Sequence, residues 1–260
     1  MNDIIFKLPQ FIDFKESFVA FIDILGFKKK VETIKTKDDF DKIAELMLAI
    51  KETAIRFSQE NDNLFSGIEI IAVSDSLIIT IPYTDVAACF KTIEFMRYFQ
   101  YSLLVTSFKT ILRGYLHKGL VYNKDGIIFG PGYITAYEQE RKIGGAPRIV
   151  VSPEIIKLAD NAVKRDKSNR ISIFERLKKD TDEHYYIDYL LPYGDVVESR
   201  YTKSDQLKDL SSVPKFIDDN IKKFQEEPNV QKKYIWLKEY FECTKDRLEQ
   251  LVYRDRDAHH

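Results

Sequence analysis

The stretch Phe18-Val-Ala-Phe-Ile-Asp-Ile-Leu-Gly-Phe27 decides how the chain folds. Its first five residues are all apolar, which is typical of a β-strand buried on both faces of a sheet. The strand ends at Asp23, and a tight connection follows in which Gly26 permits a backbone geometry that most residues resist. Because side chains two apart on a strand share a face, Phe21 is predicted to point to the same side as Asp23.

A second acidic residue lies between two short β-rich runs. Ile68–Val73 and Leu77–Ile81 are separated by Ser-Asp-Ser, which predicts a hairpin with Asp75 at its tip. Helical periodicity precedes the hairpin at residues 40–50 and follows it at residues 84–107. The order strand, helix, hairpin, helix, hairpin, helix, strand predicts an α+β fold. We expect a ferredoxin-like core with a mixed, mostly antiparallel sheet and helices.

The remainder of the chain extends the sheet and then becomes helical. The pattern predicts strands at 111–122, 127–129, 148–151 and 184–190, helices at 133–141 and from 152 onward, and a charge-rich loop or short helix over 160–183. From Lys203 a helical segment reaches about Glu226, and after a break at Pro228 another reaches about Tyr253. We expect residues 1–195 to form the core domain and residues 196–258 a helical extension packed on it.

Two carboxylates that converge at one end of a sheet form a candidate site. In the predicted plan the first strand pairs beside the hairpin, so Asp23 and Asp75 lie close together. Carboxylates bind hard divalent cations, so two Mg²⁺ or Mn²⁺ ions are expected here, with the carbonyl of Ile24 as a further ligand. On spacing alone a simpler interpretation stays open, in which Asp23 caps a helix and Asp75 is a turn residue.

The connection after the first strand is a candidate phosphate-binding loop. The backbone amides of Leu25, Gly26 and Phe27 are placed to cradle phosphate oxygens, because successive N–H groups in a tight turn form an anion site. Two metal ions beside such a loop can activate an attacking hydroxyl and neutralise a triphosphate. The pattern is therefore compatible with a metal-assisted reaction of a nucleoside triphosphate.

Four segments of the chain resemble motifs of the class III adenylate and guanylate cyclases. Phe21–Phe27 is similar to their first metal motif, Val73–Leu77 to their second, Leu112–Gly119 to their arginine-glycine-histidine-glycine strand, and Phe129–Ala136 to the start of their dimerisation helix. The similarity covers roughly residues 18–155, with the motifs in order. It implies a nucleotide cyclase with a palm-type core, a phosphorus–oxygen lyase that uses two metal ions.

The departures from these motifs concern base reading and the transition state. Where purine cyclases commonly carry a base-reading Lys and Asp, this chain has Ile71 and Ile127. Where their helix supplies an Asn and an Arg for the transition state, this chain has Ile134 and Glu138. Arg141, one helical turn beyond Glu138, is the candidate to replace the missing arginine, with a solvated helix charge as the alternative. The metal acids are thus retained while the purine-reading groups are replaced.

This combination resembles the bacterial pyrimidine cyclases of the Pycsar antiphage systems, as do Ala136–Glu140 and Gly145–Arg148. The resemblance implies conversion of UTP, or of CTP, to the 3′,5′-cyclic nucleotide (cUMP or cCMP) and pyrophosphate as a second messenger in antiviral defence. It also implies a homodimer with composite active sites and a separate effector protein that binds the cyclic nucleotide. UTP is favoured on the resemblance alone.

Other functions stay open alongside this one. A purine cyclase would need unconventional base contacts in place of Ile71 and Ile127. A degenerate module of the same fold would bind nucleotide or a protein partner without turnover. A palm-type oligonucleotide synthase would share the metal arrangement and make a linear or multi-nucleotide product.

Three further side chains are candidates for contact with the nucleotide. Arg113 is placed to neutralise phosphate charge or to hold the dimer interface, with a structural ion pair as the alternative. Phe21 is placed to stack on the base or ribose, and Tyr133 to narrow the pocket around a pyrimidine, with core packing as the alternative for both. Ile71 completes the predicted set at the base-reading position.

Composition bounds the class of protein. The chain has 260 residues, of which 44% are hydrophobic and 31% charged, which suffices for a full core. Its formal net charge of −1 leaves no global basic field for nucleic acid or an anionic membrane. No stretch approaches about 18 uncharged apolar residues, and Met1–Lys15 lacks signal-peptide features. With two widely spaced cysteines, Cys89 and Cys243, the sequence predicts a cytoplasmic protein with no membrane or nucleic-acid partner.

Overall fold

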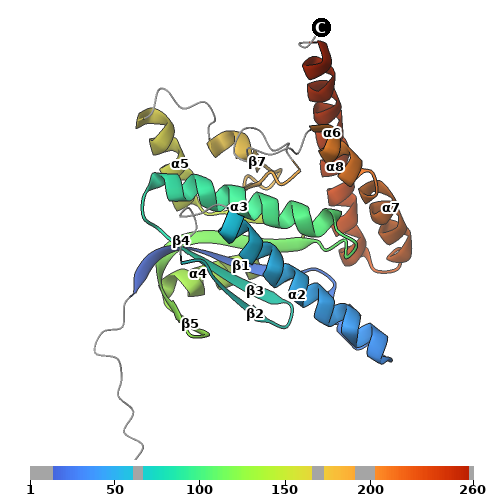
Figure 1. Ribbon diagram of the computed structural model, residues 1–260, viewed down its shortest axis with the longest axis horizontal. Helices are drawn as coiled ribbons and strands as arrows, with labels where there is room; N and C mark the ends of the chain where they lie inside the picture. Colours follow the sequence, from blue (N-terminus) through green and yellow to red (C-terminus); the bar gives the residue numbers. More distant parts are fainter. Residues whose placement is uncertain (1–13, 61–66, 166–172, 191–202, 258–260) are drawn as a thin grey trace, which may run out of the picture.

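The computed structural model describes residues 14–60, 67–165, 173–190 and 203–257 (Figure 1), so the signal-peptide expectation for residues 1–15 falls largely outside them. The first half contains β1 (Lys15–Ile24), α1 (Phe27–Glu32), α2 (Lys37–Glu60), β2 (Glu69–Val73), β3 (Ser76–Pro82), α3 (Val86–Val105) and β4 (Leu112–Lys124). Its strands pair antiparallel in the ferredoxin-like order β2-β3-β1-β4. The predicted α+β fold class is confirmed.

The second half of the sheet lies beyond β4. It contains β5 (Ile127–Phe129), α4 (Pro131–Ile143), β6 (Ile149–Val151), α5 (Pro153–Arg165), the 3-10 helix η1 (Ile173–Arg176), β7 (Leu177–Lys179) and β8 (Tyr185–Ile187). β6 runs parallel to β4, β8 and β7 follow antiparallel, and β5 folds back on β4 as a hairpin. The prediction of loop or short helix up to residue 183 is wrong at β7, where Leu177 is buried and the strand pairs antiparallel with β8.

Hydrophobic clusters cover opposite faces of the sheet, and alternate residues of β1 divide between them. Ile22 and Ile24 pack in a cluster with α2, α3 and α5, whereas Val19 and Phe21 pack in a cluster with α4. Figure 1 shows α3 above the sheet and α4 below it. The period-two alternation of a strand places Asp23 on the α4 face together with Phe21, as the sequence predicts.

Glycines on β4 let neighbouring backbones approach closely. A Cβ atom at Gly119 would lie 2.8 Å from the Cα of Gly132 in the first turn of α4. A Cβ atom at Gly114 would lie 2.6 Å from the carbonyl oxygen of Phe21 on β1. Because packed interiors have no room for contacts this short, a side chain at either position would push α4 or β1 away. The two glycines therefore allow α4 and β1 to pack directly on β4.

Three helices form the C-terminal part: α6 (Lys203–Leu210), α7 (Val213–Lys223) and α8 (Pro228–Asp257). They stand at one end of the sheet (Figure 1), and their apolar residues share a buried cluster with Leu25. The predicted segment 203–226 is divided into two helices, because two serines interrupt it and a proline lies in the first turn of α7. The predicted boundary at residues 195–196 lies outside the described residues, so the domain division stays a prediction. None of the described helices has the length and apolar character needed to cross a membrane.

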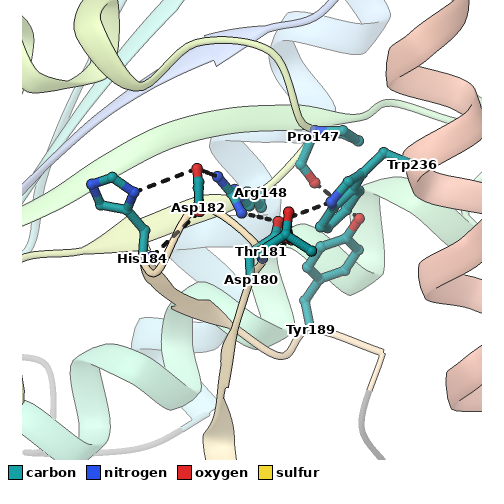
Figure 2. A network of polar contacts seen from close by, with 8 residues as sticks. All are labelled: Pro147, Arg148, Asp180, Thr181, Asp182, His184, Tyr189 and Trp236. Carbon is teal, nitrogen blue, oxygen red and sulfur yellow. Dashed lines mark hydrogen bonds and ion pairs between the residues drawn. The ribbon is translucent and has the colours of Figure 1, made fainter.

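A buried ion-pair network fastens α8 to the sheet (Figure 2). Arg148, just before β6, is 4% exposed and forms ion pairs with Asp180 and Asp182 of the β7–β8 connection. Trp236 of α8 donates a 2.9 Å hydrogen bond from Nε1 to Asp180, and its ring centre lies 5.9 Å from the Arg148 guanidinium. A single arginine thus links β6, the β7–β8 hairpin and α8.

Candidate active site

The pairing of β1 with β3 brings Asp23 beside the tip of the β2–β3 hairpin. Asp23 is opposite Ser76 in the register, and the N–H of Ile24 donates a 2.8 Å hydrogen bond to the carbonyl of Asp75. The two-residue turn is made by Ser74 and Asp75, and Ser74 has a positive φ of 57°, as tight hairpin turns require. The predicted hairpin with Asp75 at its tip is confirmed, and the two acids lie at the same end of the sheet.

Arg113 connects two acids across this end of the sheet. It lies opposite Asp23 on β4 and donates a 3.0 Å hydrogen bond from Nη2 to Oδ2 of Asp23. Its Nε lies 2.8 Å from Oε1 of Glu140 on α4, an ion pair without the alignment of a good hydrogen bond. The ion-pair alternative for Arg113 is therefore present in the structure.

Glu140 is a site residue that the sequence offered only as a possible ion-pair partner of Arg148, whereas the structure pairs it with Arg113. It is 4% exposed, and it follows Gly132 and Ala136 at intervals of four, so it continues the buried stripe of α4. An ionised carboxylate is almost never buried without a partner, and Arg113 provides the opposite charge. The one sequence signal for Glu140 is that a carboxylate lies on a helix face whose other buried residues are small and apolar.

The electrostatics of these acids favour an additional cation. Burial is the main cause of the raised pKa of Asp23, with the Asp75 charge adding to it and the Arg113 charge opposing it. Burial also raises the pKa of Glu140, again against the opposing charge of Arg113. Carboxylates whose pKa values are raised by burial and by each other's charge are stabilised in the ionised form by a cation bound between them.

The donor atoms fit a Mg²⁺ or Mn²⁺ ion. Asp23 and Asp75 offer carboxylate oxygens, and the Arg113 hydrogen bond engages only Oδ2 of Asp23. Across the described parts of the chain, no group of three or more His, Cys, Asp or Glu side chains could hold a metal ion on its own. Mg²⁺ usually binds one or two carboxylates and completes its shell with water and substrate phosphates. Two acids therefore suffice if a triphosphate binds with the metal, and the Ile24 carbonyl stays a predicted ligand.

The predicted phosphate loop is only partly available. The N–H of Leu25 donates a 3.1 Å hydrogen bond to the carbonyl of Ile111, so this amide is already used, and the Leu25 side chain is buried against the C-terminal helices. Gly26 has a φ of 79° and precedes α1, whose first turn begins at Phe27. Because first-turn amides have no carbonyl partner within their helix, Gly26 and Phe27 remain the candidates for phosphate binding.

The predicted base-binding residues meet on the α4 face of the sheet. Phe21, Ile71 and Tyr133 belong to one apolar cluster, in which Phe21 is buried and the other two are half-buried. The ring centre of Phe21 lies 6.2 Å from that of Tyr133 and 5.2 Å from that of Tyr137. Phe21 is therefore packed in the core, which is the alternative predicted for it. Ile71 and Tyr133 keep exposed atoms that a nucleobase could contact.

Arg141 lies on the exposed side of α4. Its Nη1 donates a 2.9 Å hydrogen bond to the hydroxyl of Tyr137, one turn earlier, and its guanidinium carbon lies 5.4 Å from the centre of the same ring. Its charge lowers the pKa of the adjacent Glu140 only weakly against the larger effect of burial. The structure therefore pairs Arg141 with an aromatic ring of its own helix, and its catalytic role stays a prediction.

The C-terminal helices contribute a cation that the sequence analysis missed. Lys233 of α8 is half-buried and interacts electrostatically with Arg113, Asp23 and Glu140. Burial, followed by the charge of Arg113, lowers the pKa of Lys233, and the two acids oppose this effect. More than 90 residues separate Lys233 from each of these partners in the sequence, so no local pattern connects them.

Comparisons with known proteins yield similarities of fold. No family model and no curated protein sequence matches the chain. Among solved structures, the chain is similar to an adenylate/guanylate cyclase/hydrolase from Silicibacter pomeroyi, with 15% identity, a TM-score of 0.41, and coverage of 67% of this chain and 95% of the other. It is also similar to a bacterial light-regulated adenylyl cyclase, with 12% identity, a TM-score of 0.43, and coverage of 77% and 99%.

A third solved structure is similar over a smaller share of its own length. It is a class III adenylyl cyclase-like ATP-binding protein from Pseudomonas aeruginosa, with 15% identity, a TM-score of 0.39, and coverage of 62% of this chain and 38% of the other. At identities and TM-scores this low, the substrates and activities of these proteins do not transfer to the chain. Its function therefore has to follow from its own residues at the end of the sheet.

Proposed function

We propose that the chain is a nucleotide cyclase that converts a nucleoside triphosphate to its 3′,5′-cyclic monophosphate and pyrophosphate. The observation that carries this proposal is the placement of Asp23 at the end of β1 against Asp75 in the β2–β3 turn. The turn at Gly26, which begins α1, follows directly. Two carboxylates beside helix-start amides form a site for a divalent metal and a polyphosphate.

The residues of the site have separate tasks in this reaction. Asp23 and Asp75 hold Mg²⁺ or Mn²⁺, with the carbonyl of Ile24 as a third protein ligand. When bound, two such ions supply the Lewis acidity that favours ionisation of the ribose 3′-hydroxyl and neutralises the triphosphate. The Gly26 and Phe27 amides bind phosphate oxygens. The 3′-oxygen then attacks the α-phosphorus, the bond to the β-phosphate oxygen breaks, and pyrophosphate leaves.

Arg113 orients Asp23 in this proposal and adds positive charge near the phosphates. Its guanidinium already bridges Asp23 and Glu140, and this arrangement fixes the Asp23 side chain before any ligand binds. Pre-organised charges stabilise a transition state without the cost of reorganising at the moment of reaction. The catalytic contribution of Arg141 requires that it leave its hydrogen bond with Tyr137.

We infer that the base is a pyrimidine, with UTP favoured over CTP. Ile71 and Ile127 occupy the positions at which the resemblance implies purine-reading Lys and Asp side chains. The half-buried atoms of Ile71 and Tyr133 offer an apolar and aromatic surface beside Phe21. Such a surface can stack on any base but offers no hydrogen bonds to the edge of a purine. The smaller pyrimidine ring is therefore selected by the size of the pocket rather than by hydrogen bonds.

We also infer the setting in which this reaction takes place. The resemblance to the Pycsar cyclases favours a cytoplasmic second-messenger enzyme of antiphage defence, with a separate effector protein that binds the cyclic nucleotide. A homodimer with composite sites is supported by apolar side chains exposed around β5 and the start of α4, namely Leu120, Ile127, Phe129 and Ile134. Exposed apolar side chains that gather in one region are typical of interaction surfaces.

The test is incubation of the purified protein with each of the four ribonucleoside triphosphates and Mn²⁺, followed by mass spectrometry of the products. We expect cUMP or cCMP together with pyrophosphate. A cAMP or cGMP product would keep the cyclase and overturn the pyrimidine specificity. A linear product would indicate an oligonucleotide synthase, and metal-dependent nucleotide binding without any product would indicate a binding module.

A variant pair assigns any product to the site. Asp75→Asn should abolish turnover with little change in the fold, because it removes one metal-binding charge at an accessible turn. Asp125→Asn is the matched control, since Asp125 lies in the β4–β5 turn with a positive φ of 54° that asparagine also tolerates. Full activity of Asp75→Asn would show that these acids do not hold the catalytic metal.

A further inference from the structure

The stripe of α8 that packs on the core begins with a lysine. Leu237, Tyr240 and Thr244 are buried, and their spacing of three and four residues defines one face of the helix. Lys233 lies four residues before Leu237 and therefore continues this face. Most of the lysines whose exposure the structure describes stand in solvent, whereas this one is half-buried on the packed side of its helix.

The start of α8 is held against the segment that follows Asp23. Lys29 of α1 forms a 2.5 Å ion pair with Glu227 and lies 4.8 Å from the ring centre of Phe224. Phe224 in turn stacks on Tyr234 at 5.8 Å, and Tyr234 is the neighbour of Lys233. Leu25 shares a buried cluster with residues of α7 and α8. The corner between α7 and α8 thus packs beside the Gly26 turn.

Lys233 lies close enough to the acids of the site for their charges to act on it. The charges of Asp23, Glu140 and Arg113 all act on its ammonium group, which places it at the same end of the sheet. Arg113 is engaged by both acids through contacts of 3.0 and 2.8 Å, whereas α4 turns Arg141 toward Tyr137. An ammonium partly withdrawn from water is a compact charge with three donors, and lysine in this state is a frequent phosphate ligand.

We propose that Lys233 binds the triphosphate chain of the nucleotide, so that the C-terminal helices complete the site that Asp23 and Asp75 begin. This inference rests on the proposed metal and nucleotide site, and it adds a cationic residue supplied by α8. The ammonium group replaces phosphate solvation that is lost when the nucleotide binds. The contact is made with β- or γ-phosphate oxygens, which nucleoside monophosphates lack.

The experiment compares the affinities of triphosphates and of a monophosphate. Binding of the α,β-methylene analogues of UTP and ATP, and of UMP, is measured calorimetrically with Mn²⁺ for the wild type, Lys233→Met, Lys233→Arg and Lys232→Met. We expect Lys233→Met to weaken both triphosphate analogues about tenfold or more, as the loss of a charged hydrogen bond does. UMP binding should change less than about twofold, and Lys233→Arg should retain most of the affinity. The exposed Lys232 provides the control, which should bind as the wild type does.

Two binding results would overturn the inference. Lys233→Met could bind the triphosphates as tightly as the wild type, or it could lose UMP and triphosphate equally, which is the result expected of a structural role. The emission of Trp236 in each variant reports whether α8 stays docked. The proposed function fails separately: Asp75→Asn with unchanged metal-dependent nucleotide binding contradicts the metal site itself. An inactive Asp75→Asn with a fully active Lys233→Met would contradict only the role of Lys233.

Discussion

The ion-pair network around Arg148 offers the most direct test of how α8 is attached. We expect Arg148→Met to destabilise the protein while leaving the ferredoxin-like sheet able to fold. The substitution preserves much of the apolar stem but removes the charge that faces Asp180 and Asp182. It also removes the cation that lies over the rings of Tyr186 and Trp236. Of the contacts that Figure 2 draws between Asp180 and other elements, the hydrogen bond from Trp236 alone would remain.

The size of the effect follows from the burial of the partners. Removing one member of a buried ion pair costs about 3–5 kcal/mol, because the other charge is left uncompensated. Here the side chain of Asp180 is 14% exposed and that of Asp182 is 41% exposed. Exposed pairs contribute roughly 0–1 kcal/mol, so Asp182 adds little. We therefore expect a loss of about 3 kcal/mol in the free energy of unfolding, or roughly 6–12 °C in Tm for a chain of this size.

The chain provides its own probe for this measurement. Trp236 is the only tryptophan in the sequence, and it lies in the network itself. Urea unfolding followed by its fluorescence and by far-UV circular dichroism should show an earlier midpoint for Arg148→Met. Arg148→Lys should fall between, since lysine keeps the charge and loses the planar fork. Lys142→Met is the control, because the pair that Lys142 forms with Glu138, at 3.7 Å, is exposed. Wild-type stability of Arg148→Met, or an equal loss in the control, would refute this account of α8 docking.

Further predictions concern the packing of α4 and the acid stability of the network. Gly119→Ala should destabilise the protein by about 1–3 kcal/mol in urea unfolding, because its Cβ would meet Gly132 at 2.8 Å. Burial alone would raise the pKa of Asp182, but the hydrogen bond and charge of its arginine partner outweigh this and lower it. The stability that Asp182 contributes is therefore present above its ordinary pKa of about 4 and lost as the pH falls through the lowered value. The stability difference between wild type and Asp182→Asn should accordingly shrink below about pH 4 in pH-dependent denaturation.

The parts of the site that the sequence predicts are those fixed by local patterns. The apolar run before Asp23 and the short turn around Asp75 define a strand and a hairpin by themselves. The ferredoxin-like pairing rules then bring the two acids to one end of the sheet. Cross-strand register also places Arg113 opposite Asp23, once β1 and β4 are recognised as neighbours.

The parts that the sequence misses depend on packing between distant elements. Glu140 is identified by its buried contact with Arg113, and Lys233 by the way α8 folds back against α1. The amide of Leu25 is not available to bind phosphate, because it donates a hydrogen bond to the carbonyl of Ile111, more than 80 residues away. Hydrophobic periodicity predicts which face of a helix is buried, but it does not predict which charged residues that face will contact.

The central position of β1 has a consequence for how the chain is made. As synthesis proceeds toward the C-terminus, the apolar strand β1 emerges before both of its partners, β3 and β4. Until Ser76–Pro82 and then Leu112–Lys124 leave the ribosome, both edges of β1 stay without their native neighbours. Unpaired strand edges and exposed apolar surface are the features through which unfinished chains associate. The nascent protein therefore passes through an aggregation-prone stage before β4 is made, and α8 reaches the site only after the strands of the sheet.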